Sequence, residues 1–174
     1  GVDYYTSASS DNINNPYLSD NHVSSASASD TRTYFTLGYK NKHGKSNTTT
    51  GVSIGASIEH DVASLQVGAS YAKSSKDHNR DINIKASYYY DDWSLIYPVE
   101  LRNGDQQYLT TNTRQTANLS ATGSFVLTTK LQAAITLDLV YQQGLLSTPF
   151  HRVYFKDYER VRVEQLPGSR FKIP

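Results

Sequence analysis

The sequence contains no cysteine, no methionine and a single tryptophan among its 174 residues. Without cysteine there is no disulfide framework, no thiol catalysis and no thiolate metal site. Basic residues exceed acidic ones by one, so a net charge of +1 gives no electrostatic basis for binding nucleic acid or an acidic partner. No apolar run approaches the roughly 18 residues of a membrane-spanning helix, which excludes a helical membrane protein. Because the initiator methionine is also absent, we expect a processed or partial chain.

What the sequence does contain is an alternation of apolar and small polar residues, clearest over residues 48–58. Successive side chains of a strand point to opposite faces. One face of this segment carries Val52, Ile54, Ala56 and Ile58, and the other carries Thr49, Gly51, Ser53, Gly55 and Ser57. A soluble sheet usually places lysine and glutamate on its solvent face. The small polar face instead predicts a barrel interior, with lipid against the apolar face.

The same alternation recurs in other segments, each near the ~10 residues of a tilted membrane strand. These segments cover residues 34–39, 63–71, 82–90, 117–127 and 131–141. Short polar turns connect some of them, whereas longer links lie near residues 7–30, 91–112 and 147–169. Outer-membrane barrels show this asymmetry, with short periplasmic turns and longer external loops. We therefore predict an all-β fold, an antiparallel up-and-down transmembrane β-barrel, as a single domain over residues 1–174.

The number of strands is too small for a closed membrane barrel. Six strands, with a seventh indicated at residues 2–6, fall short of the about eight with which membrane barrels begin. Residues 169–174 resemble the start of a further strand. An open sheet edge in lipid leaves backbone groups unpaired at several kcal/mol each. We therefore expect part of a longer barrel, with a sheet closed by other chains as the alternative.

Tyrosine is the standout residue, with 14 copies against 5 phenylalanines. The predicted strand directions place Tyr88, Tyr90 and Tyr141 at the external ends and Tyr39, Tyr71 and Phe125 at the periplasmic ends. Two aromatic belts at the lipid boundaries would follow, because tyrosine joins an apolar ring to a hydroxyl group. The alternative reading is that tyrosine is a good strand former.

The short motifs give little support to catalysis or metal binding. Residues 51–55 spell a serine-hydrolase elbow in mid-strand with no following helix, and residues 70–73 spell S-x-x-K without its companion motifs. The glycines are better explained as relieving crowding on a concave face. Residues 11–15 and 19–22 carry oxygen ligands for a loosely bound calcium ion, but no EF-hand loop is present. We expect no catalytic residue, no cofactor and no resident metal.

Charged residues on the predicted polar face are candidates for the barrel interior. Lys85 and Asp138 fall at barrel depth, and Asp81, Arg114 and Glu59 fall nearer the strand ends. In a wide pore these charges would tune ion selectivity, whereas in a narrow barrel they would form pairs in a packed polar interior. No ring of one sign is visible, which favours pairing.

Three stretches carry a resemblance to a known family: DWSLIYPVELR at residues 92–102, QQGLLSTPFHRVYF at 142–155 and EQLPGSRFKIP at 164–174. They resemble an uncharacterised family of Gram-negative outer-membrane β-barrel proteins, classed as a domain of unknown function. The resemblance implies a bacterial outer-membrane location and members longer than this chain, and it supplies no catalytic residue. Members are often encoded near a small lipoprotein, a thioredoxin-like protein and a flavin-attaching enzyme. It therefore implies envelope partners such as a lipoprotein.

Aromatic and basic residues in two of these stretches predict a surface at the external end. We hypothesise that Trp93, Tyr97, Phe150, Arg152 and Tyr154 form a lid or a partner-binding surface. The alternative is that they cap the barrel mouth structurally. In total the sequence predicts a non-enzymatic outer-membrane barrel that is a scaffold or channel component of a cell-envelope complex. A secreted β-sandwich binding module and an outer-membrane hydrolase are the alternatives; the hydrolase lacks a supporting Ser–His motif.

Overall fold

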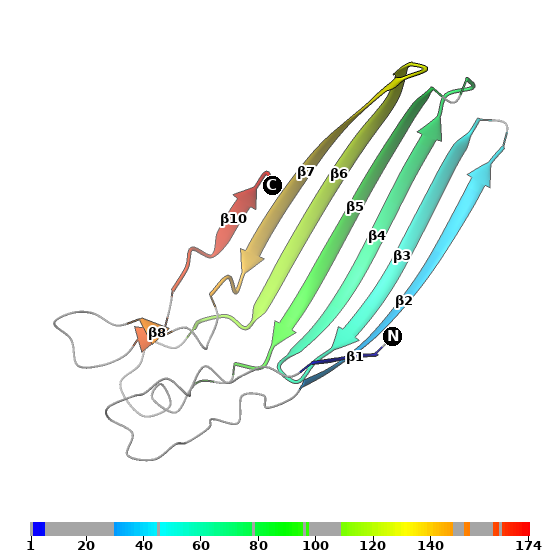
Figure 1. Cartoon of the computed structure of the whole chain (residues 1–174). Helices are drawn as coiled ribbons and strands as arrows, with labels where there is room; N and C mark the ends of the chain where they lie inside the picture. Colours follow the sequence, from blue (N-terminus) through cyan, green and yellow to red (C-terminus); the bar gives the residue numbers. More distant parts are fainter. Residues whose placement is uncertain are drawn as a thin grey trace.

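The fold is one antiparallel sheet with an up-and-down topology (Figure 1). The computed structural model describes residues 2–5, 30–44, 46–77, 79–95, 97, 109–147, 152–153, 162–163 and 165–174. The strands follow one another in the order β1-β2-β3-β4-β5-β6-β7-β10. Their bounds are β1 (Val2–Tyr5), β2 (Asp30–His43), β3 (Thr48–Ile58), β4 (Val62–Ser74), β5 (Arg80–Trp93), β6 (Thr113–Thr128), β7 (Leu131–Gly144) and β10 (Ser169–Lys172). β8 (Arg152–Val153) and β9 (Arg162–Val163) form a separate two-stranded sheet.

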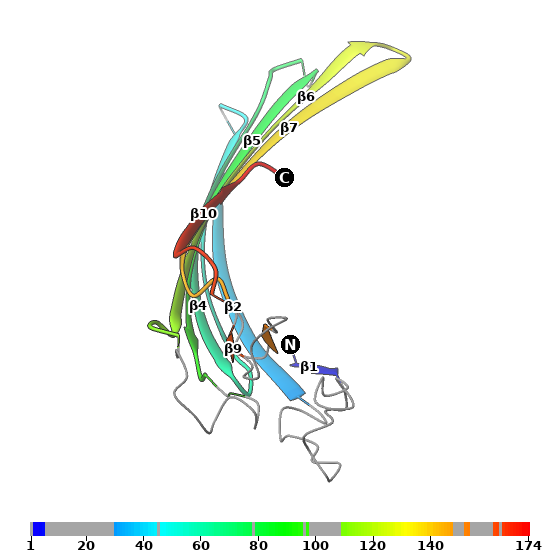
Figure 2. The ribbon, with the colours of Figure 1, turned by 90° about the vertical axis from the view of Figure 1, so that its left-hand side faces the viewer.

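The predicted strand pattern is confirmed for the all-β, antiparallel, up-and-down part of the fold. Each of the six alternating segments lies within one of the strands β2 to β7, and consecutive strands pair along nearly their whole length. Closure into a barrel is not seen among the described residues: the sheet is open and curved, with β1 at one edge and β10 at the other (Figures 1 and 2). No helix in the described part of the chain is long and apolar enough to cross a membrane.

The turns at the two ends of β4 are short, as the sequence predicts, whereas one predicted longer link differs. The reversal at residues 59–61 is tight, with the Glu59 amide donating to the Val62 carbonyl at 2.8 Å. At the next turn Asp77 accepts a hydrogen bond from the Ser75 hydroxyl, which holds the pKa of the Asp77 carboxyl below its ordinary value of 3.8. The predicted link at 91–112 starts too early, because β5 continues to Trp93 in register with β4. The links at 7–30 and 147–169 lie largely outside the described residues.

The two faces of the sheet differ sharply in chemistry and exposure. On β3 the apolar side chains of Val52, Ile54 and Ile58 are 60%, 54% and 64% exposed, whereas Ser53 and Ser57 between them are half-buried. The sheet is curved (Figure 2). The polar side chains lie on its concave face, where they are more crowded than the apolar side chains on the convex face. Among the described residues Leu145 is the single buried large hydrophobic side chain. The described part of the sheet therefore has no apolar core of its own.

Glycines on the concave face sit where a side chain would collide with its neighbours. A Cβ at Gly51 would lie 2.6 Å from Ser70 Oγ, and a Cβ at Gly68 would lie 2.6 Å from Ser53 Oγ. The expectation that these glycines relieve crowding is confirmed. Ser53 lies in mid-strand, so the hydrolase-like spelling at residues 51–55 lacks the strand-to-helix turn that exposes a nucleophile.

Gly144 ends β7 in a conformation that other residues rarely adopt. Its φ is +98°, and a Cβ there would lie 2.2 Å from the Thr113 carbonyl oxygen. This bend lets the Leu145 amide donate to the same Thr113 carbonyl at 2.7 Å and buries the Leu145 side chain. Gly144→Ala is expected to lower the free energy of unfolding by about 1–3 kcal/mol, the usual cost of such backbone strain.

Urea titration of the folded protein measures this effect. Gly44→Ala is the matched control, because nothing lies within 4 Å of a Cβ at that turn position and its φ is not in the left-handed range. We expect a clear loss for the change at Gly144 and little change at Gly44. Equal midpoints for the two variants would contradict this account of the β7 end.

Candidate functional site

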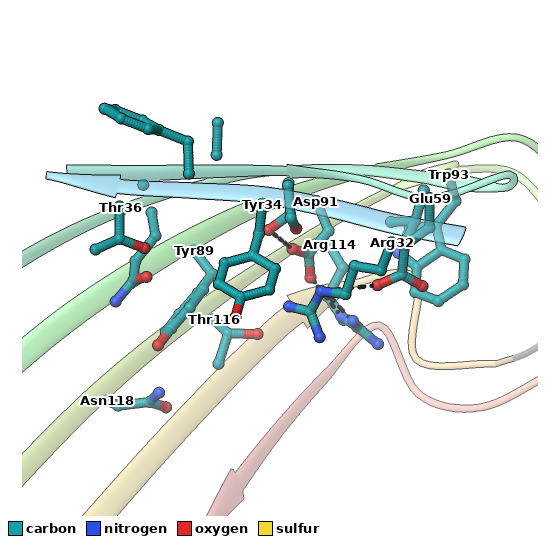
Figure 3. Close-up of a pocket in the computed structure, with 17 residues that line it drawn as sticks. Arg32, Tyr34, Thr36, Glu59, Tyr89, Asp91, Trp93, Arg114, Thr116 and Asn118 are labelled. Atoms are coloured by element: carbon teal, nitrogen blue, oxygen red, sulfur yellow. Dashed lines mark hydrogen bonds and ion pairs between the residues drawn. The ribbon is translucent and has the colours of Figure 1, made fainter. Parts of the chain in front are cut away.

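A charged cluster occupies the concave face near the ends of β2 to β6 (Figure 3). We use this name for Arg32, Glu59, Ser64, Asp91, Trp93 and Arg114. The register places Ser64, Asp91 and Arg114 directly opposite one another on three adjacent strands. All three therefore point to the same face, as in any antiparallel ladder. The cluster lines a cavity of about 400 Å³.

Asp91 is the centre of this cluster. Its side chain is buried, and its carboxylate accepts a hydrogen bond from Ser64 Oγ at 2.6 Å and another from Arg114 Nε at 2.9 Å. The Arg114 Nη2 atom also lies 2.9 Å from the same carboxylate oxygen. The Arg114 guanidinium stacks on the Trp93 ring at 4.9 Å from the ring centroid. Charge, hydrogen bonds and an aromatic face thus hold one arginine in place.

A second ion pair lies beside the first. Arg32 Nε is 3.2 Å from Glu59 Oε1, and the Arg32 guanidinium lies 5.8 Å from the centroid of the Tyr34 ring. The Arg32 side chain is 47% exposed, so this pair contributes little to stability by itself. Its consequence is local neutrality: each arginine of the cluster has a carboxylate partner.

A polar ladder continues the concave face to the β10 edge. Gln142 Nε2 donates to Thr116 Oγ1 at 3.1 Å, and Arg170 Nε donates to Gln142 Oε1 at 2.6 Å. The three residues are register partners on β6, β7 and β10. The polar face is therefore continuous across the sheet up to its last strand.

A second cavity, of about 560 Å³, opens further along the same face. Lys40 and Lys85 line it from either side, and Gly51 and Ser70 lie between them in the same register row. We call this cavity the lysine groove. It differs from the charged cluster because its floor is made of glycine and serine and its flanks are basic.

The predicted interior charges all belong to the concave face or to its end. Lys85 and Asp138 share a register row through Ser120, and Asp81 lies on the same side of β5. The predicted pairing is found for Arg114 and Glu59, whose partners Asp91 and Arg32 were not predicted. The alternation could have revealed both partners, since Arg32 is in phase with Tyr34 and Asp91 with Tyr89. Asp91 is not among the predicted charges because the predicted link at residues 91–112 begins there.

The predicted lid residues are only partly described. Trp93 belongs to the charged cluster, and the Tyr97 hydroxyl accepts a hydrogen bond from the Leu109 amide at 3.1 Å. The side chains of Phe150, Arg152 and Tyr154 lie outside the described residues, as do residues 11–15 and 19–22 with their candidate calcium ligands. Within the described part of the chain, no group of three or more histidine, aspartate or glutamate side chains is placed to hold a metal ion.

The apolar face forms a band that runs obliquely across the strands. At one end of β3, β4 and β5 the first polar residues on this face are Thr50, Lys73 and Arg80. Lys73 lies two residues beyond the register partner of Thr50, and Arg80 lies two residues beyond the partner of Lys73. From β3 to β5 the boundary thus moves by two residues per strand, whereas on β2 it stays in the row of Thr50, at Asn41. On β6 the apolar positions extend through Phe125 and Leu127.

The opposite boundary of the band shifts in the same direction. Ile58 on β3, Ala63 on β4 and Asp92 on β5 share one register row, so the apolar positions reach this row on β3 and β4 but not on β5. On β6 the first polar residue of this face is Gln115. Gln115 is the partner of Tyr90, two residues inside Asp92. All six aromatic residues expected in belts lie on this face, namely Tyr39, Tyr71, Tyr88, Tyr90, Phe125 and Tyr141. The Tyr88 hydroxyl bonds to Gln115 Oε1 at 2.8 Å, at the polar margin.

Comparison with known proteins adds no assignment. No protein-family model matches the chain, and neither a curated protein nor a solved structure matches it. The resemblance carried by residues 92–102, 142–155 and 164–174 therefore stays a prediction.

Proposed function

We propose that this chain forms part of the wall of an outer-membrane β-barrel, as a non-enzymatic channel or scaffold component of a cell-envelope complex. The lipid bilayer is its main partner, in contact with the apolar face, and the concave polar face lines the interior. The single observation that carries the proposal is the oblique apolar band on the exposed face of the sheet.

The slope of the band supports a tilted transmembrane sheet. Two residues of a strand rise about 6.8 Å, and neighbouring strands are about 4.8 Å apart. A boundary that moves two residues per strand therefore implies a tilt of roughly 55° between strands and membrane normal, and the other boundary implies somewhat less. Transmembrane strands are tilted by about 45°. A soluble sheet has no reason to keep such a slope.

The height of the band supports the same proposal. On β7 the apolar positions run from Leu131 to Tyr141, where Gln143 follows. That length is about 34 Å along the strand, or about 24 Å along the membrane normal at a tilt of 45°. The lipid-facing band of outer-membrane barrels is about 25 Å tall. The agreement extends to both margins, where tyrosines carry their hydroxyl groups.

The edges of the sheet support closure by additional strands. β10 pairs with β7 only along Val140–Gln143, so the rest of β7 has no described partner on that side. In hydrocarbon each unpaired backbone group costs several kcal/mol. We infer that further strands complete the barrel, in line with the resemblance, which also underlies the proposed Gram-negative location and lipoprotein partner.

Heat-dependent gel migration with extraction tests the proposal. The protein should stay in the membrane fraction through alkaline carbonate washes and leave it in detergent. It should also migrate faster on gels unheated than boiled, because detergent-resistant barrels stay compact. A protein that remains monodisperse in detergent-free buffer would instead favour the β-sandwich alternative, in which a second protein layer covers the apolar face. Conductance in planar bilayers then separates channel from scaffold.

A further inference from the structure

Among the described residues, the two lysines of the lysine groove have no carboxylate partner. Lys40 and Lys85 lie in one register row with Gly51 and Ser70 between them, which places their backbones about 14 Å apart across three strand spacings. The side chains between them are a hydrogen atom and a hydroxymethyl group. The small residues Gly51 and Ser70 therefore leave open space between the two long, flexible lysine side chains.

Within the described part of the chain, no carboxylate forms an ion pair with Lys40 or Lys85. The ion pairs of the described residues join Arg32 to Glu59 and Arg114 to Asp91, both in the charged cluster. Among the described residues, the nearest acids on the same face are Asp138, two strands beyond Lys85, and Asp81, four residues along β5. Both are about 10 Å or more away by strand geometry. Lys42, on the same side of β2, adds a further positive charge.

The groove also offers neutral hydrogen-bond donors. Hydroxyl groups of Ser53, Ser70 and Ser87 and the side chains of Gln66 and Tyr89 line the cavity of about 560 Å³. Any side chain at Gly51 or Gly68 would meet a serine oxygen at 2.6 Å, so the floor is as low as the backbone allows. Ammonium and hydroxyl donors around an open cavity are the ligands that an oxyanion prefers.

We propose that the lysine groove binds small oxyanions, meaning free phosphate or the carboxylate or phosphate group of a solute. The inference rests on the proposed function in one respect, that the concave face is the barrel interior. Lipid headgroups are excluded as the source, because the groove faces away from the apolar band. The groove thus gives the interior a preference for anions at one depth.

Ion quenching of a tryptophan reporter tests this proposal without requiring a conducting pore. Tyr89→Trp places a reporter at the groove, and Trp93→Phe removes the chain's only other tryptophan. At about 0.1 M salt, two unit charges within roughly 8 Å enrich iodide about twofold and deplete caesium similarly. The iodide-to-caesium quenching ratio should therefore exceed that of free N-acetyltryptophanamide by about threefold to fourfold.

Substitution and competition complete the test. Lys40→Gln with Lys85→Gln should bring the ratio down to that of the free indole. Lys73→Gln is the matched control, since Lys73 is the register partner of Thr48 on the opposite face and should leave the ratio unchanged. Inorganic phosphate at constant ionic strength should reduce iodide quenching in the reporter but not in the double lysine variant.

Each outcome decides the proposal. A ratio equal to that of the free indole, or a raised ratio that survives the double substitution, would overturn a positive groove. Iodide enrichment that phosphate does not reduce would overturn oxyanion binding. Folding of every variant is checked by far-ultraviolet circular dichroism, which reports the β-sheet content in detergent and in buffer alike. The measurement works equally in detergent and in buffer, so failure of membrane insertion would be recognised separately from failure of anion binding.

Discussion

Val67→Arg is expected to destabilise the protein folded in lipid vesicles by about 2–4 kcal/mol, the cost of arginine on the lipid face near the bilayer centre. Val67 lies on the central strand β4, within the apolar band, with 53% of its surface exposed. Its register partners Ile54 and Tyr88 are also exposed. Urea titration of the vesicle-folded protein measures the change.

Gln66→Arg is the matched control for this prediction. Gln66 precedes Val67 on the same strand but lines the concave face, where water solvates an added guanidinium. We expect a change of less than about 1 kcal/mol there. If the apolar face met water, arginine at an exposed position would cost within about 0.5 kcal/mol. Indistinguishable midpoints for the two variants would therefore contradict lipid contact.

Asp91→Ala is expected to destabilise the fold by about 3 kcal/mol, because it leaves the Arg114 charge without its carboxylate in a partly buried place. Asp91 is 7% exposed and accepts hydrogen bonds from Ser64 and Arg114, so its removal leaves two hydrogen-bond donors without their acceptor. The Arg114 side chain keeps 30% exposure, which holds the effect near the lower end of the 3–5 kcal/mol measured for buried pairs. Equilibrium urea unfolding gives the value.

A double-mutant cycle with Arg114→Met assigns the loss to the ion pair. The double variant should recover part of the stability, since it removes the unpaired cation together with the carboxylate. Asp92→Ala serves as control: Asp92 is exposed on the other face and accepts a hydrogen bond from Asn112 Nδ2 at 2.7 Å, so we expect a loss below about 1 kcal/mol. A loss of unfolding free energy at Asp92 as large as that at Asp91 would contradict a stabilising role of the Asp91–Arg114 ion pair.

The alternation of side chains is what made the fold predictable from the sequence. A period of two assigns each residue of β3 to a face without any knowledge of its neighbours, and the tight turn at Glu59 fixes how β3 and β4 pair. From these the polar face, the glycines and the concave-face positions of Lys85 and Asp138 follow. The same local rule, applied past Tyr90, would have kept Asp91 and Trp93 in the strand.

Contacts between strands could not be predicted in the same way. Whether Arg32 meets Glu59, or Lys40 shares a row with Lys85, depends on the register of several hairpins in series, and a slip of one residue would exchange the faces. The slope of the apolar band has the same origin, because it becomes visible only after all strands are aligned. Closure depends on partners for the edge strands, which the alternation within each strand does not specify.

Site-directed spin labelling along β4 tests the contact between lipid and the apolar face most directly. The chain has no cysteine, so single cysteines at Leu65, Gln66 and Val67 in turn can each carry a nitroxide in vesicles. Labels at Leu65 and Val67 should collide with oxygen dissolved in the bilayer far more than with a water-soluble nickel chelate, and the label at Gln66 should show the reverse. Labels at Leu65 and Val67 that are shielded from both reagents, or that favour the nickel chelate, would contradict the account.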